Sequence, residues 1–250
     1  MPHGAANGSR MMRNLFKRLV SKCRRVWAES SSERYVDYLR SRGARVGDGV
    51  FVREPKRVTI DLTRPSLLKI GNNVRINRGF LLLTHGYDWY VLRNLFDEVY
   101  ASSGRVTIGS NVFFGFNVTV LKGIEIGDNC IIGTGSVVTR SIPANSVAAG
   151  IPARVICSID EYREKRRIDY VVEAKDYARS IVEVHGRRPV PGDFREEFPL
   201  FLDGDQLPDD LPVAAQLGDS LAAYQRRHRA PYASFDAFLD DCDLPAVRNG

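Results

Sequence analysis

An apolar residue recurs at every sixth position of this sequence, and that period limits the folds the chain can adopt. Steps of six from residue 108 meet only bulky apolar side chains: Ile108, Phe114, Val120, Ile126, Ile132 and Val138. The same step from Val46 reaches Leu82 with a single polar interruption, at Arg64. A helical period of 3.6 residues cannot produce this pattern, whereas a short strand followed by a turn can.

Turn-forming residues separate the apolar positions. The segments GSN, GDN, GTG and GNN lie between them, and glycine and asparagine adopt left-handed backbone conformations at low cost. Three strand-and-turn units close one triangular coil of about 18 residues, and successive coils stack as parallel strands about 4.8 Å apart. Two repeat blocks, 46–84 and 105–152, therefore predict an all-β solenoid of roughly five coils.

The repeat divides the chain into three predicted parts. Residues 1–45 should form amphipathic and capping helices, 46–156 the repeat region, and 157–250 a helical extension. The spacing from Leu82 to Ile108 is not a multiple of six, so a loop over 86–104 is expected to leave the coil and return. Outside the repeat, we expect helices over 33–42, near 213–228 and near 234–241. Ser158 and Glu161 form a capping-box pattern that opens a further helix, which should run to about residue 185.

Positive charge is concentrated at the N-terminus. The first thirty residues contain seven Lys or Arg and one Glu, so they account for the whole formal charge of +6. The body is neutral, which argues against a nucleic-acid partner. Residues 10–27 have amphipathic helical spacing, and two functions stay open for them: covering the open end of the coil, or peripheral contact with an anionic membrane.

No apolar run in the sequence is long enough to span a bilayer or to serve as a secretory signal. We therefore expect a cytoplasmic protein, with a peripheral position at the inner membrane face as the alternative. The four cysteines show no CxxC spacing, which argues against a structural metal site and against a disulfide framework.

The stretch IGSNVFFGFNVTVLKGIEIGDNCIIGTGSVVTRSIPANSVAAGIPARVI resembles the hexapeptide-repeat acyltransferase family. Its last part, SIPANSVAAGIPARVI, is the more specific match. The resemblance implies a left-handed parallel β-helix, a homotrimer, and transfer of an acetyl group from acetyl-CoA to a hydroxyl or amine. The THGYDW segment is similar to bacterial O-acetyltransferases that modify capsular or other surface polysaccharides, which implies a carbohydrate acceptor.

The same resemblance implies a histidine as general base. Of the four histidines only His85 lies in the repeat region, where the chain leaves for the loop. A neutral imidazole there can accept the proton of an acceptor hydroxyl. The loop over 86–104 is rich in aromatic residues. It should bind the acceptor through Tyr87, Asp88 and Trp89, with Asp88 holding hydroxyls or orienting His85. The alternative is that its rings fold the loop onto the coil or onto a neighbouring subunit.

Acetyl-CoA is expected along the coil, next to main-chain groups and two cations. The residues that the resemblance implies are Phe113, Gly115, Gly133, Thr134, Arg140 and Arg154. Lys122 replaces a proline that many relatives carry, and its function stays open.

A repeat architecture of this kind also occurs with three other functions. A γ-type carbonic anhydrase needs three histidines around a metal, and a repeat region with one histidine cannot supply them, so we expect no metal. A small-molecule acetyltransferase acting on serine, a xenobiotic or an amino sugar is an alternative, as is a non-catalytic trimeric scaffold.

Overall fold

The computed structural model describes residue 22 and residues 24–245, so most of the basic segment 10–27 lies outside the described residues. The chain divides into two compact units, one ending at Tyr162 and the other starting at Arg163. Among the described helices, none is both long enough and apolar enough to cross a membrane.

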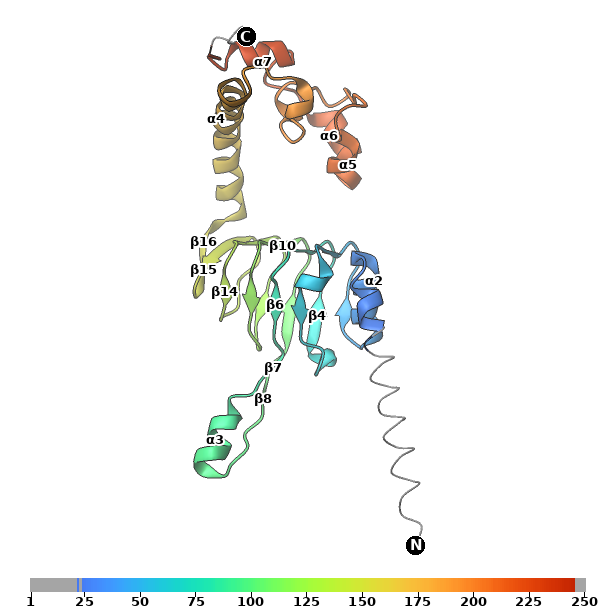
Figure 1. The fold of residues 1–250 in the computed structure, drawn as a ribbon, viewed down its shortest axis with the longest axis vertical. Helices are drawn as coiled ribbons and strands as arrows, with labels where there is room; N and C mark the ends of the chain where they lie inside the picture. Colours follow the sequence, from blue (N-terminus) through green and yellow to red (C-terminus); the bar gives the residue numbers. More distant parts are fainter. Residues whose placement is uncertain (1–21, 23, 246–250) are drawn as a thin grey trace. The chain divides into compact units, whose positions relative to one another are not determined.

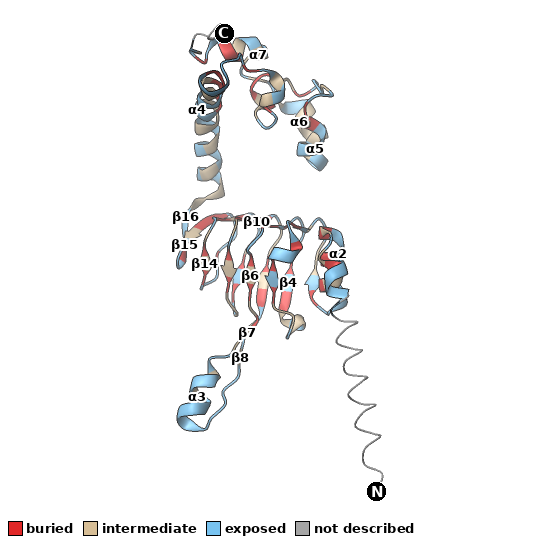
Figure 2. Ribbon diagram, in the orientation of Figure 1, coloured by how far each residue is buried: buried red, intermediate tan, exposed pale blue. Residues whose placement is uncertain are grey.

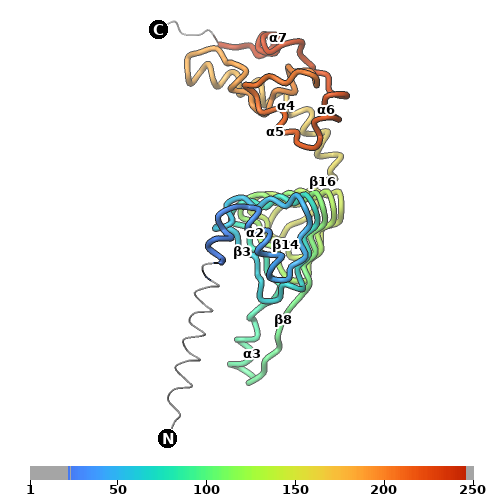
Figure 3. The backbone as a smooth tube through the Cα atoms, turned by 90° about the vertical axis from the view of Figure 1, so that its right-hand side faces the viewer, coloured from blue at the N-terminus to red at the C-terminus, as the bar shows by residue number. Residues whose placement is uncertain are grey.

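The first unit is built from three parallel sheets that the chain visits in turn (Figures 1 and 3). Sheet A consists of β1 (Arg45–Val46), β4 (Leu68–Ile70), β9 (Val106–Ile108) and β12 (Glu125–Ile126). Sheet B consists of β2 (Phe51–Val52), β5 (Arg75–Ile76), β10 (Val112–Phe114), β13 (Cys130–Ile132), β15 (Ser146–Gly150) and the antiparallel β16 (Ala153–Ser158). Sheet C consists of β3 (Thr59–Ile60), β6 (Leu81–Leu82), β11 (Thr119–Val120) and β14 (Val137–Val138). The expected parallel β architecture with flanking helices is confirmed.

The six-residue series of the second block forms the centre of this unit. All six side chains, from Ile108 to Val138, are 0% exposed. At the corner between sheets A and B, Asn111, Asn129 and Asn145 have left-handed backbones with φ of 57°, 56° and 59°. Asn111 Nδ2 donates to Asn129 Oδ1 at 2.9 Å, and Asn129 Nδ2 donates to Asn145 Oδ1 at 2.8 Å. The turn residues thus link successive coils as well as reversing the chain.

In the first block, the six-residue step predicted one strand too many. Ile60, rather than Val58, pairs with Leu82 in sheet C. The chain takes longer paths on both sides of β3, through the 3-10 turns η1 (Pro55–Arg57) and η2 (Pro65–Leu67). Arg64 lies at the start of the second turn, so the polar interruption marks a corner where no strand is present.

Helix α2 (Ser32–Ser41) covers the first coil. Tyr35, Val36 and Leu39 are buried in the same apolar cluster as Val52, and the Val52 N–H donates to Ser32 Oγ at 2.8 Å. The predicted helix over 33–42 is confirmed within a residue at each end. This helix closes the end of the coil, the function that the sequence analysis considered for residues 10–27.

The excursion after sheet C is an antiparallel hairpin rather than an irregular loop. It consists of β7 (His85–Gly86) and β8 (Ser102–Ser103), with helix α3 (Trp89–Phe96) between them. Figure 2 shows α3 exposed along much of its length. Seven large apolar side chains of the hairpin are 57–68% exposed: Tyr87, Tyr90, Val91, Leu95, Phe96, Val99 and Tyr100. These side chains are therefore largely uncovered by the described part of the chain.

The second unit has a separate core. Helix α4 (Ile159–His185) leads into it, followed by η3 (Pro191–Asp193), η4 (Phe198–Leu200), α5 (Val213–Leu217), η5 (Gly218–Ser220), α6 (Leu221–Arg227) and α7 (Phe235–Asp240). Buried Phe194, Phe198 and Phe238 pack with Ala174 and Ala178 of α4. The predicted capping box is present, because Glu161 Oε2 accepts from the Ser158 N–H at 2.7 Å and the Glu161 N–H donates to Ser158 Oγ at 3.1 Å. The helical structure expected near 213–228 consists of two short helices, α5 and α6, with the 3-10 turn η5 between them.

Candidate active site

His85 lies at the corner where the chain leaves strand β6 of sheet C and enters the hairpin. The neighbouring strand β3 places Asp61 beside it. Thr84, the residue before His85, holds this carboxylate through its N–H at 3.0 Å and its hydroxyl at 2.6 Å, both to Oδ2. Thr63 holds the other oxygen, Oδ1, through its N–H at 3.0 Å and its hydroxyl at 2.5 Å. Two strand ends of sheet C therefore fix the Asp61 side chain from both sides.

The imidazole of His85 contacts this carboxylate directly. Its Nδ1 lies 2.5 Å from Asp61 Oδ2 and 2.9 Å from Thr63 Oγ1, and the two side chains are only 11% and 8% exposed. Burial raises the pKa of Asp61, but the hydrogen bonds from Thr63 and Thr84 outweigh it and hold the pKa well below its usual range. Asp61 is therefore ionised at neutral pH and accepts a hydrogen bond from the Nδ1–H group, so that in the neutral form of the ring Nε2 is the hydrogen-bond acceptor.

The second ring nitrogen, Nε2, is buried and has no hydrogen-bond partner in the described part of the chain. The Tyr87 ring stands edge-on to the imidazole, with the ring centroids 4.7 Å apart. A buried acceptor without a donor is uncommon in a folded protein. The arrangement is suited to taking a proton from a hydroxyl that binds there.

The predicted acceptor residues lie next to one another at the start of the hairpin. Tyr87 is 65% exposed, and its ring centroid lies 6.1 Å from that of the partly buried Trp89. Asp88 occupies the N-cap position of α3, and the carboxylate at Nδ1 of His85 is that of Asp61. Asp61 is not among the site residues predicted from the sequence. The pairing of β3 with β6 would have found it, because that register brings Thr63 next to His85.

Three of the residues predicted to bind acetyl-CoA cluster at the corner between sheets B and C. Thr134 Oγ1 accepts from the Phe116 N–H at 3.2 Å. A Cβ atom added to Gly115 would lie 2.6 Å from the Thr134 nitrogen, and one added to Gly133 would lie 2.8 Å from Ala149 Cβ. Both glycines are therefore needed for close stacking of the coils, whatever else they contact.

The other three lie elsewhere in the first unit. Phe113 is on the outer face of sheet B and 41% exposed. Arg154 is exposed on β16, and Arg140 is exposed after β14, at the corner that also holds His85. One chain thus puts His85 and Arg140 on one side of sheet C and Gly115 and Thr134 on the other. The predicted residues do not form one site within a single chain.

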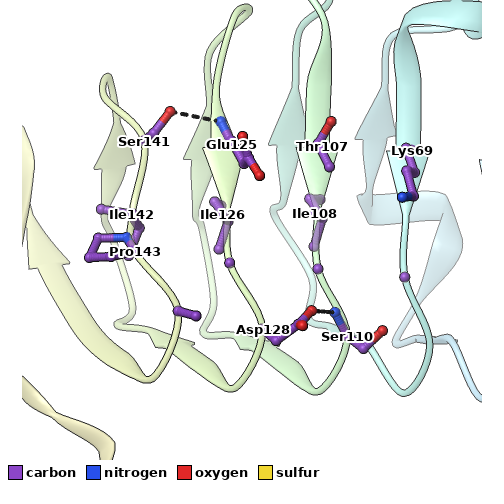
Figure 4. A pocket seen from close by; sticks show the side chains of 14 residues that line it. Lys69, Thr107, Ile108, Ser110, Glu125, Ile126, Asp128, Ser141, Ile142 and Pro143 are labelled. Atoms are coloured by element: carbon purple, nitrogen blue, oxygen red, sulfur yellow. Dashed lines mark hydrogen bonds between the residues drawn. The ribbon is translucent and has the colours of Figure 1, made fainter.

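A wide hollow of about 790 Å³ lies on sheet A (Figure 4). Its floor includes Lys69, Thr107 and Glu125, and Asp128 at its edge accepts from the Ser110 N–H at 2.6 Å. His85 is not among its lining residues, so we place the chemistry at the buried imidazole. Among the described residues there is no group of three or more His, Cys, Asp or Glu that could hold a metal ion.

Comparison with known proteins identifies the family. A family profile described as "Hexapeptide repeat of succinyl-transferase" matches residues 105–140. Protein CapG of Staphylococcus aureus is 35% identical over 145 residues, a match that covers 58% of this chain and 80% of CapG. The chain belongs to the hexapeptide-repeat acyltransferase family.

Other members of this family match shorter parts of the chain. Galactoside O-acetyltransferase of Escherichia coli K12 is 43% identical over 107 residues, which are 42% of this chain and 51% of that protein. The chain thus spans about half the length of this relative. A solved galactoside acetyltransferase in complex with coenzyme A is 31% identical, with 59% of this chain and 83% of that chain covered and a TM-score of 0.43. A maltose O-acetyltransferase from Clostridium difficile 630 is 29% identical, with 58% and 87% covered and a TM-score of 0.41.

Proposed function

We propose that this protein is an acetyl-CoA-dependent O-acetyltransferase that acts on a sugar hydroxyl, with His85 as its general base. The observation that carries the proposal is the buried, unpartnered Nε2 of an imidazole whose Nδ1 is bound to the Asp61 carboxylate. Nε2 takes the proton of the acceptor hydroxyl while the hydroxyl oxygen attacks the thioester carbonyl carbon. The carbon–sulfur bond then breaks, and the leaving coenzyme A thiolate receives that proton from the imidazolium.

Asp61 acts in this scheme as a positioning residue. Its carboxylate fixes the tautomer of His85 and stabilises the imidazolium while the proton resides on the ring. Substrate contact is assigned to other groups: the rings of Tyr87 and Trp89 for the sugar, with Asp88 for its hydroxyls. The acetyl-CoA contacts are assigned to Phe113, Gly115, Gly133, Thr134, Arg140 and Arg154.

The fold that we propose for residues 46–156 is a left-handed parallel β-helix of roughly five coils, assembled as a homotrimer. Two observations support the assembly. The apolar side chains of the hairpin lack cover within the described part of the first unit, and a second copy would supply it. His85 and the corner of Gly115 and Thr134 lie on opposite sides of sheet C, so a site between two chains would bring the two sets together.

For the acceptor, we propose a sugar of a surface polysaccharide or of its precursor. The names of the galactoside and maltose O-acetyltransferases describe those relatives as acting on sugars. The aromatic side chains around His85 support the same class here, since ring faces pack against the C–H surfaces of sugars.

The test is release of free thiol from acetyl-CoA across a panel of sugars, nucleotide sugars, serine and polysaccharide fragments. His85→Asn should lower kcat/KM for the best acceptor by roughly two to four orders of magnitude, the usual contribution of a general base. His185→Asn, at an exposed histidine of α4, is the matched control and should leave turnover unchanged. Equal turnover by the wild type and His85→Asn would refute the proposal and favour the scaffold alternative.

A further inference from the structure

Lys122 lies at the same corner of the coil as His85, one strand further along sheet C. Leu82 and Val120 are register partners, and the Leu83 N–H donates to the Val120 carbonyl at 3.0 Å. The two ends of the hairpin, at Gly86 and Gly104, lie close to Lys122. A Cβ atom added to Gly86, the residue after His85, would lie 3.5 Å from Lys122 Cε, and one added to Gly104 would lie 3.1 Å from the Lys122 carbonyl carbon. The end of the Lys122 side chain therefore lies beside the hairpin residue that follows the proposed base.

The ammonium group of Lys122 has no ion-pair partner within 4.0 Å in the described part of the chain, although the residue is partly buried. Asp88 is the nearby acid on the hairpin, and its Oδ1 would lie 2.8 Å from the same added Cβ at Gly86. The two side chains thus flank Gly86 without forming a direct pair. An ammonium group that has no direct ion-pair partner is free to donate charge-assisted hydrogen bonds to a bound anion.

Two ligands of the proposed reaction can supply such an anion: the phosphates of acetyl-CoA, or an acidic group on the acceptor. The thioester must reach Nε2 of His85, and the long pantetheine arm keeps the phosphates away from that point. Lys122 is only one strand from His85 in sheet C, about 4.8 Å in backbone spacing. The acceptor is held at His85 by its reacting hydroxyl, so a substituent on the same sugar ring lies within reach of Lys122.

We infer that Lys122 binds a carboxylate or phosphate group of the acceptor, and that the acceptor is therefore an acidic sugar. This inference rests on the proposed function, because it assumes that the acceptor hydroxyl binds at His85. Lys122 is thus a specificity-determining residue. A charge-assisted hydrogen bond from an ammonium to such an anion is worth about ten-fold to a hundred-fold in kcat/KM.

The experiment compares matched acceptors that differ in one acidic group. The pairs are methyl glucoside with methyl glucuronide, methyl galactoside with methyl galacturonide, and methyl glucoside with glucose 1-phosphate. Thiol release gives kcat/KM for each acceptor with the wild type, Lys122→Gln, Lys122→Arg and the control Lys56→Gln, at an exposed lysine of η1. The wild type should prefer an acidic member by about ten-fold or more. Lys122→Gln should abolish that preference with little effect on the neutral member, whereas Lys122→Arg and Lys56→Gln should keep it.

Three results would overturn the inference. The wild type could use acidic and neutral members equally well, Lys122→Gln could slow both members equally, or it could raise only the KM for acetyl-CoA. The second result would indicate a structural or oxyanion-stabilising function, and the third would assign the anion to acetyl-CoA. If turnover requires His85 but is the same for acidic and neutral acceptors, only this inference is refuted. If turnover does not require His85, the proposed function itself is refuted.

Discussion

Replacing Asp61 by asparagine tests how His85 is prepared for catalysis, because the change keeps the size of the side chain and removes its charge. Each carboxylate oxygen of Asp61 accepts one backbone N–H at 3.0 Å, Oδ1 from Thr63 and Oδ2 from Thr84. The asparagine NH₂ group must therefore face an N–H donor in either orientation. A buried donor left without an acceptor costs about 1–3 kcal/mol, so we expect a loss of that size in the free energy of unfolding.

The effect on catalysis follows from the same geometry. If the NH₂ group faces Nδ1, the ring proton moves to Nε2, and Nε2 can no longer accept the proton of the acceptor. If the amide oxygen faces Nδ1, the tautomer is kept but the imidazolium loses its counter-charge. Both outcomes impair the proton transfer, and we expect kcat/KM to fall by roughly two to four orders of magnitude.

The pH dependence of stability gives a second measurement. The folded state lowers the pKa of Asp61, so the ionised carboxylate stabilises the fold fully above the unfolded value of about 3.9. That stabilisation is lost progressively as the pH falls from this value through the lower folded pKa. The difference in unfolding free energy between wild type and Asp61→Asn should therefore shrink in strong acid.

Thiol release from pH 6 to 9 and urea unfolding at neutral and acidic pH are the assays. Asp37→Asn, at an aspartate of α2 whose side chain is 72% exposed, is the control and should change neither quantity. The reasoning is refuted if folded Asp61→Asn keeps more than about half of the wild-type kcat/KM. A general base loses far more than that when its tautomer or counter-charge is lost.

Three further predictions concern the fold and the assembly. Asn129→Ala should lower the unfolding free energy by about 1–2 kcal/mol in urea, because φ is 56° there and the left-handed conformation is unfavourable for alanine; Asn129→Gly should cost less. Ser158→Ala removes the hydroxyl that accepts from the Glu161 N–H and should lower the free energy of unfolding by about 1 kcal/mol. A thermal melting curve that matches the wild type would contradict a stabilising capping box. Leu95→Asp places a charge on a hairpin side chain that is 68% exposed in the single chain. If a second copy covers this hairpin, sedimentation should show a smaller assembly than the wild type, and an unchanged mass would contradict that arrangement.

The sequence predicted the repeat region well where the period is unbroken. From Ile108 to Val138 every sixth residue occupies the same position in its strand, and all six side chains are buried in the core. The same reasoning failed between Val52 and Ile70, where two longer turns take up the residues of one expected strand. Val58 is buried there as well, so its apolar character could not reveal that Ile60 is the residue in register.

That difference in register also explains why the sequence did not reveal Asp61 as the carboxylate beside His85. Asp88 is three residues from His85, and sequence proximity favoured it. In stacked coils, however, the neighbours of a side chain come from the coils above and below it, so the partner is a full coil away along the chain. Asp61 is 24 residues from His85, and its place becomes predictable only once Ile60 is paired with Leu82. Lys122 follows by the same reasoning from the pairing of Leu82 with Val120. Asp61 and Lys122 therefore come just after the two strands, β3 and β11, that flank β6.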